Sequence, residues 1–113
     1  MKITGWGRNI TIDCHTSAPR DEESLINEIK VKQVIARGNG RSYGDSAISK
    51  ANTISTLFLN HFLEFDDSGL LVAEAGVTLE EIINVFLPRG WFPPVTPGTK
   101  FVTLGGMVAS DVH

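Results

Sequence analysis

Apolar side chains recur with helical spacing in two stretches of the chain. In the first stretch, acidic residues 21–23 precede the apolar positions and suit the positive end of a helix dipole, which predicts a helix over residues 20–29. In the second stretch, Thr78 and Glu81 have the spacing of a capping box. The apolar residues that follow fall on one helical face: Leu79, Ile82, Ile83, Phe86 and Leu87. Pro88 and Gly90 then end this helix.

Shorter apolar runs, many of them β-branched, are typical of strands. The predicted strands cover residues 10–14, 33–37, 53–60, 62–66 and 70–75. We expect the strand at 33–37 to be buried, because its apolar run is continuous. The last two strands flank Asp67-Ser68-Gly69, which indicates a hairpin.

The remaining segments have no regular period. The opening residues 5–8 are predicted to be irregular, and residues 91–99 contain three prolines and must be extended or turned. Residues 103–113 are small and apolar, with paired glycines at a turn into a helix. The order of these elements predicts an α+β fold with a small mixed β-sheet and two helices. Because the sequence ends after His113 without a helix stop, we expect it to be part of a longer protein.

Composition excludes several classes of protein. With 42% hydrophobic and 20% charged residues, the 113-residue chain has the balance of a globular domain and not of a disordered segment. A net charge of -3 does not favour nucleic acid as a partner, and no segment is long and apolar enough to span a membrane. Cys14 is the only cysteine, which excludes an internal disulfide and fits a reducing, cytoplasmic location. His15 and His61 lack partners at metal-ligand spacing, so no metal site is expected.

Five of the 11 glycines fall in two clusters, which suggests that the backbone there takes a positive φ or closely approaches another group. Gly38, Gly40 and Gly44 lie in one segment directly after the predicted strand at 33–37, and Gly105-Gly106 form a second cluster. A diphosphate needs donors that crowd around it, and backbone N–H groups can do so where the chain bends tightly and no Cβ intrudes. The first cluster therefore predicts a phosphate-binding loop, to which Arg41 could add charge and Ser42 a hydroxyl donor.

Two common phosphate-binding motifs do not match this loop. A P-loop requires a lysine directly after its last glycine, and Asp45 stands there instead. A dinucleotide-binding βαβ motif requires a different glycine spacing and a helix, which residues 45–48 do not indicate. On the loop alone, an ordinary surface connection is an equally good interpretation. The presence of a second glycine cluster in so short a chain makes it harder to explain both clusters as ordinary turns.

Taken together, residues 36–45 and 97–113 resemble a known family pattern. They are similar to the FAD-linked oxidases of the vanillyl-alcohol oxidase and p-cresol methylhydroxylase (PCMH) superfamily, and in particular to the decaprenylphosphoryl-β-D-ribose oxidase group. The opening Gly5-Trp6-Gly7-Arg8 is also similar to that group. The resemblance implies the first subdomain of a PCMH-type FAD-binding domain at residues 1–95 and the start of the second at 96–113. A separate cap domain would bind the substrate.

The resemblance also implies a set of FAD-contacting residues. The loop from Ala36 to Ser46 would wrap the diphosphate, a second group would line the adenosine and diphosphate side, and the last residues would approach the flavin. The loop residues are Ala36, Arg37, Gly38, Asn39, Gly40, Arg41, Ser42, Tyr43, Gly44, Asp45 and Ser46. The other residues are Gly98, Thr103, Leu104, Gly105, Gly106, Ser110 and His113.

The implied reaction is hydride transfer from an alcohol or sugar carbon to FAD. Many relatives carry a histidine at the position of Tyr43 and attach it covalently to the flavin. A phenol is a poor substitute for a neutral imidazole, so we expect non-covalent FAD. The catalytic base would lie outside this chain. Two alternatives are a non-catalytic module that binds a nucleotide or another phosphate, and a purely structural part of a longer protein. The isolated chain is expected to bind FAD weakly and could self-associate through exposed apolar surface.

Overall fold

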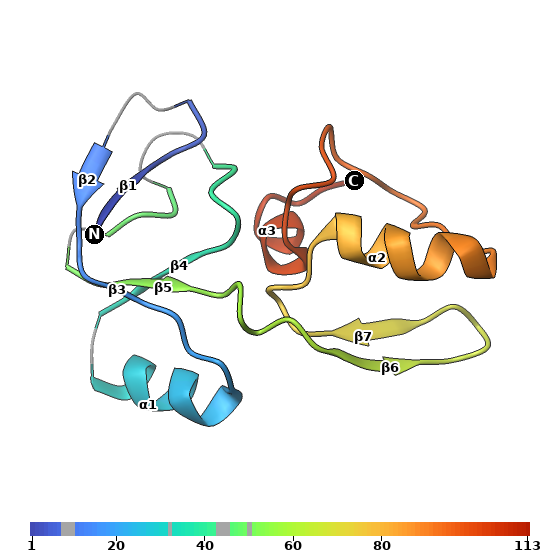
Figure 1. Cartoon of the computed structure of the whole chain (residues 1–113), viewed down its shortest axis with the longest axis horizontal. Helices are drawn as coiled ribbons and strands as arrows, with labels where there is room; N and C mark the ends of the chain where they lie inside the picture. Colours follow the sequence, from blue (N-terminus) through green and yellow to red (C-terminus); the bar gives the residue numbers. More distant parts are fainter. Residues whose placement is uncertain (8–10, 32, 43–45, 50) are drawn as a thin grey trace. The chain divides into compact units, whose positions relative to one another are not determined.

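The computed structural model describes residues 1–7, 11–31, 33–42, 46–49 and 51–113. They form two compact units, Met1–Leu59 and Asn60–His113. Figure 1 labels the helices and strands of each unit.

The first unit contains a parallel sheet and a separate antiparallel pair (Figure 1). The elements are β1 (Lys2–Thr4), β2 (Thr11–Asp13), β3 (Thr16–Ser17), α1 (Glu22–Val31), β4 (Ile35–Arg37) and β5 (Thr53–Ser55). Strand β5 lies between β3 and β4 and pairs with both in parallel, while β1 pairs antiparallel with β2. Helix α1 follows β3 and precedes β4, as parallel pairing requires a crossover. Both sheets therefore hold their strands through contacts that are distant in sequence.

Local chemistry starts helix α1 where the acidic residues stand. The carboxylate of Asp21 accepts a hydrogen bond of 2.7 Å from the backbone N–H of Ser24. This backbone bond is the main cause that lowers the pKa of Asp21. The core of the unit lies elsewhere, where Ile3, Cys14 and Ile48 are buried together.

The second unit is a hairpin covered by a helix. Its elements are β6 (Phe62–Phe65), β7 (Leu71–Ala73), α2 (Leu79–Phe86), the 3-10 helix η1 (Leu87–Arg89) and α3 (Leu104–Ala109). Strands β6 and β7 pair antiparallel, and the core joins α2 to the hairpin through Val77, Ile82 and Phe86, with Phe65 and Leu71 packed against them. The Thr78 half of the predicted capping box is confirmed, since the Thr78 hydroxyl accepts from the backbone N–H of Glu81 at 3.2 Å.

The α+β fold class is confirmed, with corrections to its details. Instead of one small mixed sheet and two helices, the described residues form three small sheets and three α-helices, α3 included. The strand expected at 53–60 is confined to Thr53–Ser55. The prediction that strand 33–37 is buried was wrong: β4 is shorter, Ala36 is exposed and its neighbours are half-buried.

Two further differences concern the ends of elements. Leu87 was predicted on the buried stripe of the second helix, but it is 53% exposed because the helix tightens into η1 there. Gly90 ends that turn in a left-handed conformation with φ 87°. The strands β1 and β3 were not predicted, since three and two residues are too few to show a period.

Candidate phosphate-binding site at the glycine loop

The glycine loop begins at the carboxyl end of β4, beside the central strand of the parallel sheet. The carbonyl of Arg37 accepts hydrogen bonds from the backbone N–H of Thr56 at 2.9 Å and from its hydroxyl at 3.3 Å. These bonds anchor Arg37, near the start of the loop, to the segment that follows β5. The carboxyl ends of parallel strands are where ligands bind in open sheets of this kind.

Gly40 adopts the backbone conformation that the sequence indicated for this loop. Its φ is +68°, in the left-handed region that residues with a Cβ rarely adopt. A Cβ built there would lie 2.6 Å from Nη2 of Arg37. Within the part of the chain that the structure describes, the backbone N–H groups of Gly38 and Gly40 donate to no acceptor of the protein. The loop therefore presents open donors beside a guanidinium, which suits an anion.

The N-terminal segment contacts the same loop. The backbone N–H of Trp6 donates to the carbonyl of Ser42 at 2.7 Å, and the guanidinium carbon of Arg41 lies 4.3 Å from the centre of the Trp6 ring. Nη2 of Arg37 donates to the carbonyl of Thr4 at 2.8 Å. Two positively charged side chains of the loop are thus held by residues that precede the parallel sheet.

A cavity of about 410 Å³ opens at this end of the parallel sheet. Its volume lies within the range of small-molecule sites, about 300–1,000 Å³. Residues that line it come from β1, β3, β5 and the loop, among them Ile3, Ser17, Arg37, Gly38, Asn39 and Gly40. Of the predicted loop residues, those from Arg37 to Ser42 are half-buried, whereas Ala36 and Ser46 are exposed. Tyr43, Gly44 and Asp45 lie outside the described residues.

The second glycine cluster lies in the second unit and is arranged differently. Thr103 is buried and forms the N-cap of α3, where its hydroxyl accepts from the backbone N–H of Gly106 at 3.1 Å. The N–H of Leu104 donates to the Val77 carbonyl at 2.7 Å, and that of Gly105 donates to the Ala75 carbonyl at 2.9 Å. The amides of this helix start are therefore already used within the chain.

Packing explains the first glycine of that pair. A Cβ on Gly105 would lie 3.0 Å from the Cβ of Ala75 and 3.3 Å from its carbonyl oxygen. Close by, Thr78 and Thr103, the N-caps of α2 and α3, form an isolated antiparallel β-bridge. The second cluster thus serves to join two helix starts, and any cofactor contact made by residues 103–106 would use groups other than these amides.

The other predicted contacts of this unit lie at its surface. Gly98 is exposed, and a Cβ there would meet nothing within 4 Å. Ser110 ends α3, and His113 Nδ1 lies 2.6 Å from the carbonyl of Asp111, which has a φ of 52°. Their roles at a cofactor stay predictions.

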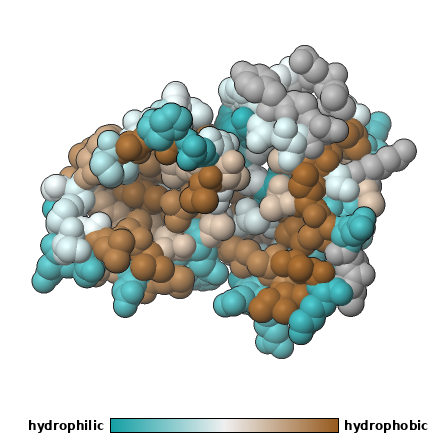
Figure 2. Space-filling model, turned by 180° about the vertical axis from the view of Figure 1, so that it is seen from behind, coloured by the Kyte–Doolittle hydropathy of each residue, from teal (hydrophilic) through white to brown (hydrophobic). Residues whose placement is uncertain are grey.

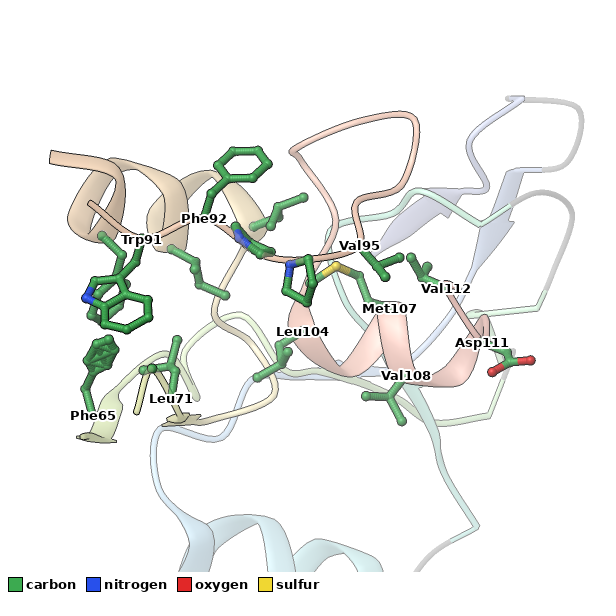
Figure 3. Close-up of a pocket in the computed structure, with 16 residues that line it drawn as sticks. Phe65, Leu71, Trp91, Phe92, Val95, Leu104, Met107, Val108, Asp111 and Val112 are labelled. Atoms are coloured by element: carbon green, nitrogen blue, oxygen red, sulfur yellow. The ribbon is translucent and has the colours of Figure 1, made fainter. Parts of the chain in front are cut away.

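A further cavity, of about 540 Å³, lies within the second unit (Figure 3). Figure 3 shows Phe65, Leu71 and Trp91 together at one end and Val108, Asp111 and Val112 at the other. Among the described residues that line it, Asp111 has the only charged side chain. The described lining residues carry no positively charged side chain to pair with a phosphate, so we do not assign the diphosphate here.

Among the described residues, no group of three or more His, Cys, Asp and Glu side chains is placed to hold a metal ion. None of the described helices combines the length and the apolar content that crossing a bilayer requires.

Comparison with known proteins identifies the family. The family model described as FAD binding domain matches residues 16–113. The chain belongs to this family. A similar protein is the decaprenylphosphoryl-β-D-ribose oxidase of Mycolicibacterium smegmatis, which is 33% identical over 99% of the chain and 26% of the relative. The L-gulonolactone oxidase 5 of Arabidopsis thaliana is 39% identical over 53% of the chain and 10% of that protein.

Solved structures show the same fold in this FAD-binding domain. A histidine-to-alanine mutant of cholesterol oxidase from Brevibacterium sterolicum superposes with a TM-score of 0.84 at 16% identity, over 99% of this chain and 24% of the oxidase. A solvent-stable cholesterol oxidase superposes with a TM-score of 0.78 at 24% identity and the same coverage. The chain thus spans about a quarter of these relatives, and it represents the FAD-binding part of FAD-linked oxidases.

Proposed function

We propose that this FAD-binding domain holds the diphosphate of FAD on the loop from Ala36 to Ser46. The observation that carries the proposal is the turn at Gly40, where φ is +68° and the N–H groups of Gly38 and Gly40 point to no described acceptor of the protein. Arg37 and Arg41 add positive charge on either side of that turn. Charged donors and bare amides together suit the two negative charges of a diphosphate.

We further propose that the whole protein oxidises an alcohol or sugar carbon. Bound FAD would supply the hydride acceptor, and the protein would supply position and electrostatics. The names of the relatives support this class of reaction, since they include oxidases of a ribose derivative, of gulonolactone and of cholesterol. The substrate-binding cap and the catalytic base would lie outside these 113 residues. A first subdomain at 1–95, a second that starts at 96, and a cytoplasmic location belong to the same proposal.

The flavin would be bound without a covalent link, because Tyr43 stands where many relatives carry the histidine that is attached. Acid denaturation of the full-length holo-protein followed by centrifugation tests this directly. We expect the yellow colour in the supernatant. Colour that stays with the pelleted protein would contradict non-covalent binding.

The proposed function itself is tested by an absorption spectrum of the full-length protein after incubation with FAD and removal of free cofactor. We expect the two flavin bands, near roughly 370 and 450 nm, to remain with the protein. A protein that binds ADP or inorganic pyrophosphate but retains no flavin would instead be the non-catalytic phosphate-binding module that the sequence left open.

A further inference from the structure

Residues Lys2–Trp6 lie ahead of the segment that the FAD-binding family model matches, which begins at residue 16. They nevertheless make three contacts with the glycine loop. Two involve backbone groups of the N-terminal segment, the Thr4 carbonyl and the Trp6 N–H, and the third is the Trp6 ring. The geometry of these contacts points to a role for this segment at the phosphate site.

The contact between Arg37 and Thr4 determines where the guanidinium lies. Because Nη2 of Arg37 donates to the Thr4 carbonyl at 2.8 Å, the side chain folds back over its own loop. It then fills the space beside Gly40, where a Cβ would be 2.6 Å from Nη2. The Thr4 carbonyl belongs to β1, whose pairing with β2 holds it in place. The N-terminal strand therefore positions the charge next to the open amides.

The contacts of Trp6 hold the other side of the loop. Its backbone N–H binds the Ser42 carbonyl at 2.7 Å, and its ring lies under the guanidinium of Arg41, 4.3 Å from ring centre to Cζ. The Trp6 side chain is 47% exposed, so burial in a core does not account for its position. Because a guanidinium is planar, an arginine stacked on an indole holds its N–H donors in a plane parallel to the ring, so the stack fixes the directions in which they point.

We propose that Trp6 is a positioning residue of the cofactor site, which presets Arg41 and the loop between Arg37 and Ser42 to receive the diphosphate. The inference rests on the proposed function, since it names how that same loop is held. The ligand group concerned is the diphosphate, which FAD and ADP share. The flavin ring is not involved.

The test uses the full-length apo-protein and its variant Trp6→Leu. This change removes the aromatic face and keeps the backbone N–H that binds Ser42. We expect the dissociation constants of FAD and of ADP to rise by the same factor, about three- to fivefold. The variant Trp6→Phe, which retains an aromatic face, should restore most of the affinity. The unfolding midpoint of the apo-protein should stay close to that of the wild type.

The chain offers a matched control in the same unit. The guanidinium of Arg20 lies 4.1 Å from the centre of the Phe58 ring, a similar contact that does not involve the glycine loop. We expect Arg20→Gln to leave both dissociation constants unchanged. Should Trp6→Leu fail to fold, Trp6→Met, which also lacks an aromatic face and keeps the charge of Arg41, is measured in the same way.

The outcomes separate the two proposals. If the wild type binds FAD and Trp6→Leu binds it equally well, the positioning role is wrong and the proposed function stands. A loss of affinity that Trp6→Phe does not restore, or that comes with a lower unfolding midpoint, means a structural role and also overturns it. A wild type that binds neither FAD nor ADP overturns both proposals.

Discussion

Replacing Gly40 with valine tests the turn on which the phosphate site depends. At φ +68° an L-residue is strained, at a cost of about 1–3 kcal/mol, and a β-branched side chain lies at the upper end of that range. The new Cβ would also lie 2.6 Å from Nη2 of Arg37, so this flexible side chain must move and lose its 2.8 Å bond to the Thr4 carbonyl. A half-buried charged hydrogen bond of this kind contributes roughly 1.5 kcal/mol.

Together these losses amount to about 3–4 kcal/mol, or a factor of roughly 100 to 1,000 in affinity if FAD requires the native loop. A side chain that also obstructs close approach of the phosphates would remove measurable binding altogether. Titration of the full-length apo-protein with FAD, followed by flavin fluorescence, measures the effect. Gly40→Ala should give a smaller loss, because alanine carries the positive-φ strain without the β-branch.

Gly90 supplies the matched control for backbone strain. Its φ is +87°, yet a Cβ there would meet nothing within 4 Å. We expect Gly90→Ala to lower the free energy of unfolding by about 1–2 kcal/mol while FAD affinity stays the same. Unchanged FAD affinity in Gly40→Val would remove this loop from the cofactor site and refute the reasoning.

Three further predictions follow from the structure. Gly105→Ala should destabilise the apo-protein by about 1–3 kcal/mol in urea denaturation, because the new Cβ meets Ala75 at 3.0 Å; an unchanged midpoint would contradict this packing. Hydrogen bonds from His61, chiefly from its backbone N–H, lower the pKa of Glu74, so its contribution to stability should be present above the ordinary carboxyl pKa and be lost as pH falls through the folded value. Glu74→Gln should reduce the loss of stability at low pH. An unaltered dependence of stability on pH would refute this role of Glu74. The isolated 113-residue chain should bind FAD more weakly than micromolar, since it spans 26% of an oxidase relative, and tighter binding in a titration would contradict this.

Apolar surface bears on the behaviour of the isolated chain as well. Figure 2 shows apolar side chains at the surface of both units, and Leu63, Leu70 and Phe92 are all more than half exposed. Self-association of the isolated chain therefore stays a prediction, to be measured by sedimentation at several concentrations.

The local sequence pattern was sufficient to predict the elements that are long or are bounded by clear capping and turn residues. The helix Leu79–Phe86 followed from its apolar stripe and its cap at Thr78, and the hairpin followed from Asp67-Ser68-Gly69. Both depend on neighbours within a few residues, where side-chain period and turn chemistry act directly. The same holds for Gly40, whose positive φ was expected from its place in a glycine cluster.

The strands β3 and β1 could not be predicted in that way. Strand β3 pairs with β5 over two residues and β1 has three residues, so no periodicity distinguishes β3 and β1 from loops. Their existence depends on partners far along the chain. For the same reason, the contacts that Trp6 and Thr4 make with the loop have no signal in the local sequence beyond the resemblance of residues 5–8 to one oxidase group.

The sequence by itself thus determined the α+β class, the family and the two glycine clusters, because composition, period and motif are properties of neighbouring residues. Only the tertiary structure distinguished the clusters. It leaves the amides of Gly38 and Gly40 open among the described residues, whereas those of Leu104 and Gly105 bind Val77 and Ala75. Whether an amide is available to a ligand depends on which distant carbonyl the folded chain brings to it.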